Sequence, residues 1–136
     1  MISAMINAEV ELPSRIDSML KVEAMIDDIG STLGLNEDVR ANMLVAVSEA
    51  VKNAIELGNK NDASKSVSLR VDKKDSEIIF TIKDRGTGFD FNNLADPTAP
   101  ENIEKITGRG IFLMRALADK VEFSNGGNTV AVHFNV

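Results

Sequence analysis

The stretch SEAVKNAIELGN (residues 48–59) decides how the rest of the chain is interpreted. It closes a segment whose apolar residues recur at helical spacing, which predicts an amphipathic helix. Glu49 and Asn53 are four residues apart, so they lie one above the other on the same helical face. A carboxylate and an amide stacked in this way can share a metal ion and an attacking hydroxyl group. Most pairs of this kind are solvated surface residues, so other parts of the chain must decide its meaning.

Two helices and a strand are predicted on the N-terminal side of this stretch. Residues 6–12 alternate apolar and polar side chains, which predicts a short strand. Ser14 is a candidate N-cap for a first helix that Gly34 ends. Asn36 is the candidate N-cap of the helix that contains Glu49 and Asn53, and Gly58 ends it. The predicted buried stripe of this second helix consists of Val39, Met43, Val47, Ala50, Val51 and Ala54.

Strand patterns dominate the C-terminal side. Residues 65–71 and 77–83 both alternate with period two, and the charged segment 72–75 between them predicts a hairpin turn. Segment 84–108 is irregular, and a connection of this length in a small domain is usually functional or disordered. An apolar helix is predicted over 110–118.

A second hairpin follows at the C-terminus, with strands over 120–124 and 129–135 around the turn Asn-Gly-Gly-Asn (125–128). Helices and antiparallel strands segregate along the chain. The order therefore predicts an α+β fold: a two-layer α/β sandwich whose mixed, mostly antiparallel sheet carries helices on one face. The length predicts one domain over residues 1–136.

Composition narrows the classes of function. The 136 residues carry a formal net charge of -6 with a pI of about 4.8, which disfavours non-specific binding to nucleic acid or to an anionic membrane. There are no cysteines, which excludes disulfides and thiolate metal sites. The single histidine, His133, excludes a histidine-rich metal centre and lies in a predicted strand, where a structural role is expected. No apolar run approaches the length of a membrane span and no secretory signal opens the chain, so a cytoplasmic protein is expected.

Two glycine-containing loops could complete a site around Glu49 and Asn53. The segment DRGTGFD (84–90) follows directly on a strand, where glycines let the backbone approach a ligand closely. Asp84 could accept a hydrogen bond from an exocyclic amine such as that of adenine, or it could cap a tight turn. Gly108-Arg109-Gly110 precedes the apolar helix, and the N–H groups at a helix N-terminus bind phosphate well. Neither loop matches the Walker A or the Rossmann pattern.

The order and spacing of the three elements resemble the GHKL ATPase superfamily, with an N box and two glycine boxes around an ATP lid. Within it, residues 8–136 resemble the bacterial anti-sigma factor serine kinases. The motifs that carry the resemblance are SEAVKNAI (48–55), DRGTGFD (84–90), DPTAPEN (96–102) and GRGIFLMR (108–115).

The resemblance implies a role for each matching residue. Glu49 would be the general base that takes the proton of an acceptor serine, and Asn53 would bind Mg²⁺ bridging the ATP phosphates. Asp84 would bind the adenine amino group, and residues 91–107 would form the lid. The remaining implied nucleotide contacts are Gly86, Gly88, Gly108, Arg109 and Gly110.

The resemblance also implies the partners: a sigma factor that the protein sequesters, an anti-sigma factor antagonist that it phosphorylates, and a second copy of itself. One departure favours an alternative, a non-catalytic nucleotide-dependent switch. Leu57 stands where the family often has a histidine, one turn beyond Asn53. The detached catalytic domain of a histidine kinase is a third reading. It is disfavoured because the chain has no room for a dimerisation helix pair.

Overall fold

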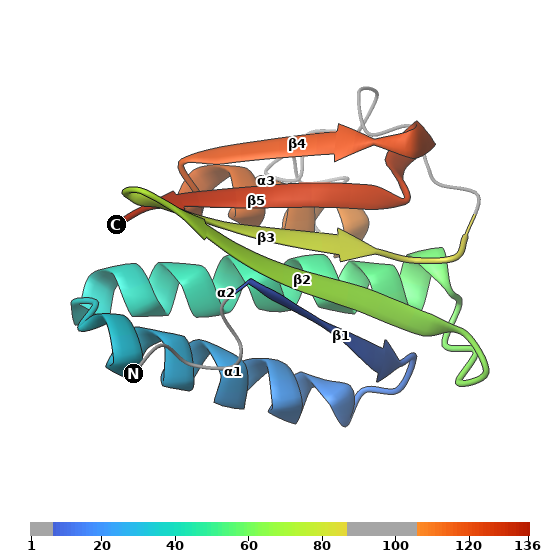
Figure 1. The fold of residues 1–136 in the computed structure, drawn as a ribbon. Coiled ribbons are helices and arrows are strands. Elements are labelled where there is room, and N and C mark those ends of the chain that lie inside the picture. The colour runs from blue at the N-terminus through green and yellow to red at the C-terminus, as the bar shows by residue number, and fades with distance from the viewer. Residues whose placement is uncertain (1–6, 87–105) are drawn as a thin grey trace.

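The sheet predicted from the alternating runs forms the front layer of the protein (Figure 1). The structure, a computed structural model, describes residues 7–86 and 106–136. Its strands lie in the order β1-β2-β3-β5-β4, and each neighbouring pair is antiparallel. The strands are β1 (Ala8–Pro13), β2 (Ser66–Lys74), β3 (Glu77–Lys83), β4 (Lys120–Ser124) and β5 (Thr129–Asn135).

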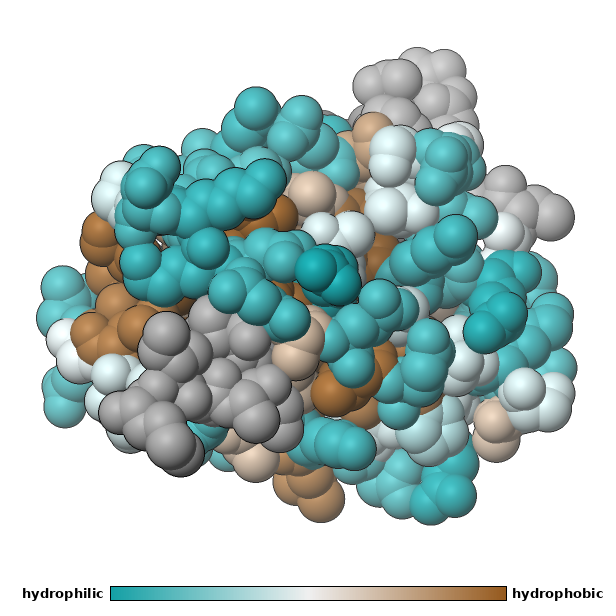
Figure 2. Space-filling view, viewed as in Figure 1, coloured by the Kyte–Doolittle hydropathy of each residue, from teal (hydrophilic) through white to brown (hydrophobic). Residues whose placement is uncertain are grey.

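Strand register places most of the apolar side chains of the five described strands on one face. One row crosses the whole sheet, because Leu69 pairs with Val10 and Ile82, and Val130 pairs with Ile82 and Phe123. Period-two alternation then turns the polar residues to the other face, and hydrophilic side chains cover much of the molecule seen in Figure 2. The sheet therefore has one core face and one open face.

Among the described residues, three helices cover the core face: α1 (Ser18–Leu33), α2 (Glu37–Asn53) and α3 (Ile106–Leu117). The Asn36 side chain accepts a 2.9 Å hydrogen bond from the N–H of Val39, which confirms the predicted N-cap of α2. Gly34 ends α1 in the left-handed conformation, with a φ of 63°. At its C-terminal end α2 passes into η1 (Ala54–Gly58), one turn of π-helix.

The predicted strands 77–83, 120–124 and 129–135 are confirmed at both ends. Two predictions about the sheet are wrong. A mixed sheet needs a parallel pair, and the described strands have none. The charged segment 72–75 is not a turn, since β2 continues to Lys74, which pairs with Glu77. The turn itself is Asp75-Ser76, with Asp75 at a φ of 52°.

Two predicted helix starts are also wrong. Ser14 does not cap α1; its hydroxyl is buried and donates to the carbonyl of Lys65, at 2.6 Å. Helix α3 begins at Ile106 rather than Gly110. Glycine disfavours a helix interior, but here it permits close packing on α2. A Cβ on Gly110 would lie 2.9 Å from Oε2 of Glu49 and 3.1 Å from Nδ2 of Asn53.

The fold brings distant segments to one end of α2. Because Lys83 at the end of β3 pairs with Thr129 at the start of β5, the loop after β3 meets the β4–β5 turn. Both lie beside η1, which continues α2. Among the described residues no helix is long and apolar enough to cross a membrane.

Candidate functional site

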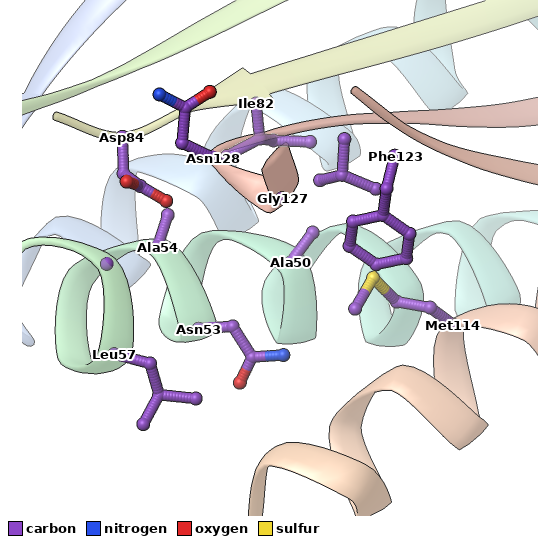
Figure 3. A pocket seen from close by; sticks show the side chains of 12 residues that line it. Ala50, Asn53, Ala54, Leu57, Ile82, Asp84, Met114, Phe123, Gly127 and Asn128 are labelled. Carbon is purple, nitrogen blue, oxygen red and sulfur yellow. The ribbon is translucent and has the colours of Figure 1, made fainter. Parts of the chain in front are cut away.

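A pocket opens where α2 and η1 meet the ends of β3 and β5 (Figure 3). It encloses about 470 Å³ of space, which includes open solvent at its mouth. Its walls are mostly apolar, with few polar groups, as small-molecule sites require. The lining residues are Ala50, Asn53, Ala54, Leu57, Gly58, Ile82, Asp84, Met114, Phe123, Gly127, Asn128 and Val130.

Asp84 supplies the buried carboxylate of this pocket. Its backbone N–H donates to the carbonyl oxygen of Asn128, at 2.9 Å. Its Oδ1 accepts a 2.7 Å hydrogen bond from the N–H of Gly86, as expected of a DxG turn. Burial raises the pKa of the Asp84 carboxyl above its ordinary value, and the hydrogen bond from Gly86 offsets part of this effect. The second carboxylate oxygen remains able to accept a hydrogen bond from a ligand.

The backbone of Gly58 packs directly against this carboxylate. A Cβ on Gly58 would lie 2.2 Å from Cγ of Asp84, and one on Gly86 would lie 2.2 Å from the carbonyl oxygen of Gly58. Both distances are too short for any side chain, so the two glycines allow η1 and the Asp84 loop to touch. Gly58 therefore does more than end a helix, the only role predicted for it.

Glu49 and Asn53 lie together where α2 contacts α3. Both side chains reach the backbone of Gly110, within about 3 Å of where its Cβ would be. Asn53 also lines the pocket, and its Nδ2 is buried with no hydrogen-bond partner among the described residues. A buried amide without a partner is costly, so this group is available to a ligand.

The donor set fits a magnesium ion held mainly by substrate. Within residues 7–86 and 106–136 no three histidine or acidic side chains gather into a metal-binding group. Mg²⁺ is commonly bound through one or two protein oxygens together with phosphate and water. The Asn53 amide, whose oxygen and nitrogen positions are interchangeable by a flip, and the Glu49 carboxylate could supply such oxygens.

Other predicted site residues are less completely placed. Gly86 holds Asp84 by its N–H, although it does not line the pocket. Gly108, Arg109 and Gly110 lie inside α3 and not in a loop that precedes it. Gly88 and residues 91–105 of the predicted lid lie outside the described residues, and 106–107 begin α3.

Three residues near Asp84 were not predicted: Gly58, Asn59 and Asn128. The carbonyl oxygen of Asn128 accepts the hydrogen bond from the backbone N–H of Asp84. The Nδ2 of Asn128 donates a 3.4 Å hydrogen bond to the carbonyl of Gly86. The predicted hairpin could have identified Asn128, because the turn of one hairpin must meet the end of the neighbouring strand. No pattern in the sequence shows that Gly58 touches Asp84.

Leu57 lies at the mouth of the pocket with 43% of its surface exposed. In Figure 3 it points to the same side as Asn53, while Asp84 and Asn128 stand at the other wall. The π-helical turn does not take Leu57 out of the site. The departure from the family pattern therefore lies beside the candidate ligand groups.

A family model described as the histidine kinase-like ATPase domain matches residues 12–134. Among curated proteins, a serine-protein kinase RsbW from Bacillus subtilis is 28% identical over 131 residues, which cover 91% of this chain and 82% of the relative. The serine-protein kinase RsbW of Oceanobacillus iheyensis is 27% identical over 123 residues, covering 86% and 78% of the two chains.

Among solved structures, the fold matches a crystal structure of the RsbU and RsbW domains of Rv1364c from Mycobacterium tuberculosis. The TM-score is 0.59 at 20% sequence identity, over 93% of this chain. This chain spans 30% of that larger chain. At this identity the similarity supports the two-layer fold.

Proposed function

The chain belongs to the histidine kinase-like ATPase domain family, and from this premise we propose that it is an ATP-dependent protein serine kinase. The acceptor would be a serine of an anti-sigma factor antagonist, and the protein would also sequester a sigma factor, as the motif resemblance implies. The relatives named serine-protein kinase RsbW support the kinase activity. One observation carries the proposal: Asp84 and Asn53 line the same apolar-walled pocket, and Glu49 lies beside Asn53 against Gly110.

The adenine base would enter the pocket and donate its amino group to the Asp84 carboxylate. The apolar walls contributed by Ile82, Met114 and Val130 would cover the faces of the ring. A buried carboxylate that is already held by Gly86 needs little reorganisation to accept this hydrogen bond. Asp84 would therefore select the base, while the glycines beside it allow the close approach.

The phosphates would extend from the pocket toward Asn53 and the N-terminal part of α3. Mg²⁺ would supply charge neutralisation on the triphosphate when bound. Asn53 would hold the ion through its side-chain oxygen, and its Nδ2, which has no hydrogen-bond partner among the described residues, would donate to a phosphate oxygen. Gly108, Arg109 and Gly110 remain the proposed phosphate contacts. Gly88 would, with Gly86, allow the close approach to the base, and a lid over 91–107 stays part of the proposal.

Glu49 would act as the general base in the transfer step. The acceptor serine oxygen would form a bond to the γ-phosphorus as the bond from that phosphorus to the bridging oxygen of ADP breaks. The serine proton would pass to the Glu49 carboxylate. Because α3 contacts α2 through Gly110, the backbone of α3 lies against Glu49 and limits where its carboxylate can move.

The test is transfer of label from γ-labelled ATP with Mg²⁺ to the cognate antagonist. Wild-type protein should label a serine of the antagonist, and Glu49→Ala should abolish the transfer while it keeps ATP binding. The base assignment is wrong if Glu49→Ala transfers label at the wild-type rate. A cytoplasmic location and a homodimer remain part of the proposal.

Leu57 supports a second candidate function, a nucleotide-dependent switch without transfer. An exposed leucine beside Asn53 cannot donate the hydrogen bond that a histidine would. ATP binding measured by calorimetry, with no transfer to the antagonist, would favour the switch. If the Leu57 side chain limits turnover, Leu57→His should transfer label to the antagonist faster than wild type.

A further inference from the structure

A buried asparagine lies behind the candidate base-binding carboxylate and outside the pocket. Asn59 directly follows η1, and only 1% of its surface is exposed. An asparagine side chain offers two N–H donors and one carbonyl acceptor, and each of these has a partner here. Nδ2 donates to Oγ of Ser14 at 2.8 Å and to the carbonyl of Ser66 at 3.1 Å, and Oδ1 accepts from the N–H of Arg85 at 2.7 Å.

The contact with Arg85 fixes the loop that carries Asp84. The backbone N–H of Asp84 is held by Asn128, that of Arg85 by Asn59, and that of Gly86 by the Asp84 carboxylate itself. Asn128 also donates to the carbonyl of Gly86. Two asparagines therefore hold the loop from opposite sides, one from the β4–β5 turn and one from the end of η1.

Asn59 also fixes the position of η1 on which Gly58 lies. Its own backbone N–H donates to the carbonyl of Ala54 at 2.9 Å and closes the π turn. The same residue thus joins the helix that carries Asn53 to the loop that carries Asp84. Because the η1 contact is made by the backbone, a change of the Asn59 side chain would release the Asp84 loop and leave the helix in place.

We propose that Asn59 is a positioning residue for base recognition, which holds the Asp84 carboxylate in place through the N–H of Arg85. The inference rests on the proposed nucleotide site. Asn59 contacts no ligand in this account and acts only through the loop. Its loss should therefore weaken recognition of the base and leave binding of the phosphates unchanged.

Ser14→Ala is the matched control for Asn59→Ala. Ser14 is equally buried and belongs to the same hydrogen-bonded cluster, but it does not touch Arg85. Both variants should lower the melting temperature. Only Asn59→Ala should weaken ATP binding, by roughly three- to tenfold for one lost hydrogen bond, with binding of inorganic tripolyphosphate and Mg²⁺ unaltered.

The variant Asn59→Asp separates the positioning of the Asp84 loop from the stability of the fold. The aspartate keeps an acceptor for the N–H of Arg85 but loses both donors of Nδ2. It should melt at a lower temperature than wild type and still prefer ATP over GTP as wild type does. Equal losses of ATP affinity in Ser14→Ala and Asn59→Ala would overturn the proposal, as would an equal loss of tripolyphosphate binding in Asn59→Ala.

Hydrogen exchange at the amide of Arg85, measured without nucleotide, tests whether Asn59 holds the Asp84 loop, independently of ATP binding. Exchange should accelerate at least tenfold in Asn59→Ala relative to Ser14→Ala, and unchanged exchange would contradict the positioning role. If wild-type protein binds no ATP, the proposed function fails instead, and the exchange result still decides whether Asn59 holds the loop.

Discussion

Gly58→Ala should damage the base-binding end of the site through a single methyl group. The added Cβ would lie 2.2 Å from Cγ and 2.3 Å from Oδ2 of Asp84, whereas carbon atoms in contact sit about 3.5 Å apart. Asp84 would have to move by about 1 Å or more. It cannot do so freely, because its N–H and its Oδ1 are both hydrogen-bonded.

The expected loss of ATP affinity follows from the hydrogen bond that Asp84 would make to the base. A hydrogen bond to a charged group contributes about 1.5–3 kcal/mol, so its loss should weaken ATP binding by about ten- to a hundredfold. Overpacking should also lower the free energy of unfolding by about 1–3 kcal/mol. Backbone strain adds nothing, because Gly58 does not have a positive φ.

Calorimetric titration with Mg-ATP, at a temperature where the variant is folded, measures the effect. Gly30→Ala is the matched control, because its Cβ would lie 2.3 Å from Nε of Arg40, away from the pocket. That variant should change the stability and leave the affinity for ATP at the wild-type value. A folded Gly58→Ala protein that binds ATP as tightly as wild type would refute the reasoning.

Three further predictions concern other residues. Because burial raises the pKa of Asp84 above 3.8, folding disfavours its charged form, and wild-type stability falls as the pH rises through that pKa. Asp84→Asn should be more stable than wild type at neutral pH, with the difference in unfolding free energy disappearing below about pH 3.8; a difference independent of pH would contradict this. Asn36→Ala removes the cap of α2 and should cost about 1 kcal/mol in urea unfolding, whereas Asn36→Asp should be nearly neutral. Gly110→Ala places a methyl group 2.9 Å from Oε2 of Glu49 and should slow label transfer about tenfold or more, and an unchanged rate would argue against Glu49 as the base.

The strands could be predicted from the sequence because each has one buried and one open face. The alternation of apolar and polar residues from Glu77 to Lys83 and from Thr129 to Asn135 therefore predicted both ends of β3 and β5 correctly. Alternation failed in segment 72–75, where charged residues lie on an exposed part of a hairpin. There the pairing of Lys73 with Ile78 continues the ladder, although neither composition nor period shows it.

The helix boundaries depended on contacts that a local pattern does not contain. Asn36 was predicted because its cap is made within three residues. Ser14 has the same capping chemistry, but Asn59 and Lys65 use its hydroxyl from 45 and 51 positions away. Gly110 is helical because a small residue lets α3 approach Glu49, a gain that its propensity does not reveal.

The candidate site was predicted where a motif lies on one element and missed where two elements meet. Glu49, Asn53 and Asp84 were found by spacing and by position at a strand end. The surroundings of Asp84 were not found, because Gly58, Asn59 and Asn128 acquire their roles only by tertiary contact.

Titration of ¹⁵N-labelled protein with Mg-ATP, followed by NMR, tests the central claim most directly. The account predicts saturable shifts at the amides of Asp84, Gly86 and Asn128 and at the side-chain amide of Asn53, with residues of the open sheet face such as Arg70 unchanged. Shifts confined to that open face, or no saturable shift at all, would contradict the claim that this pocket binds ATP.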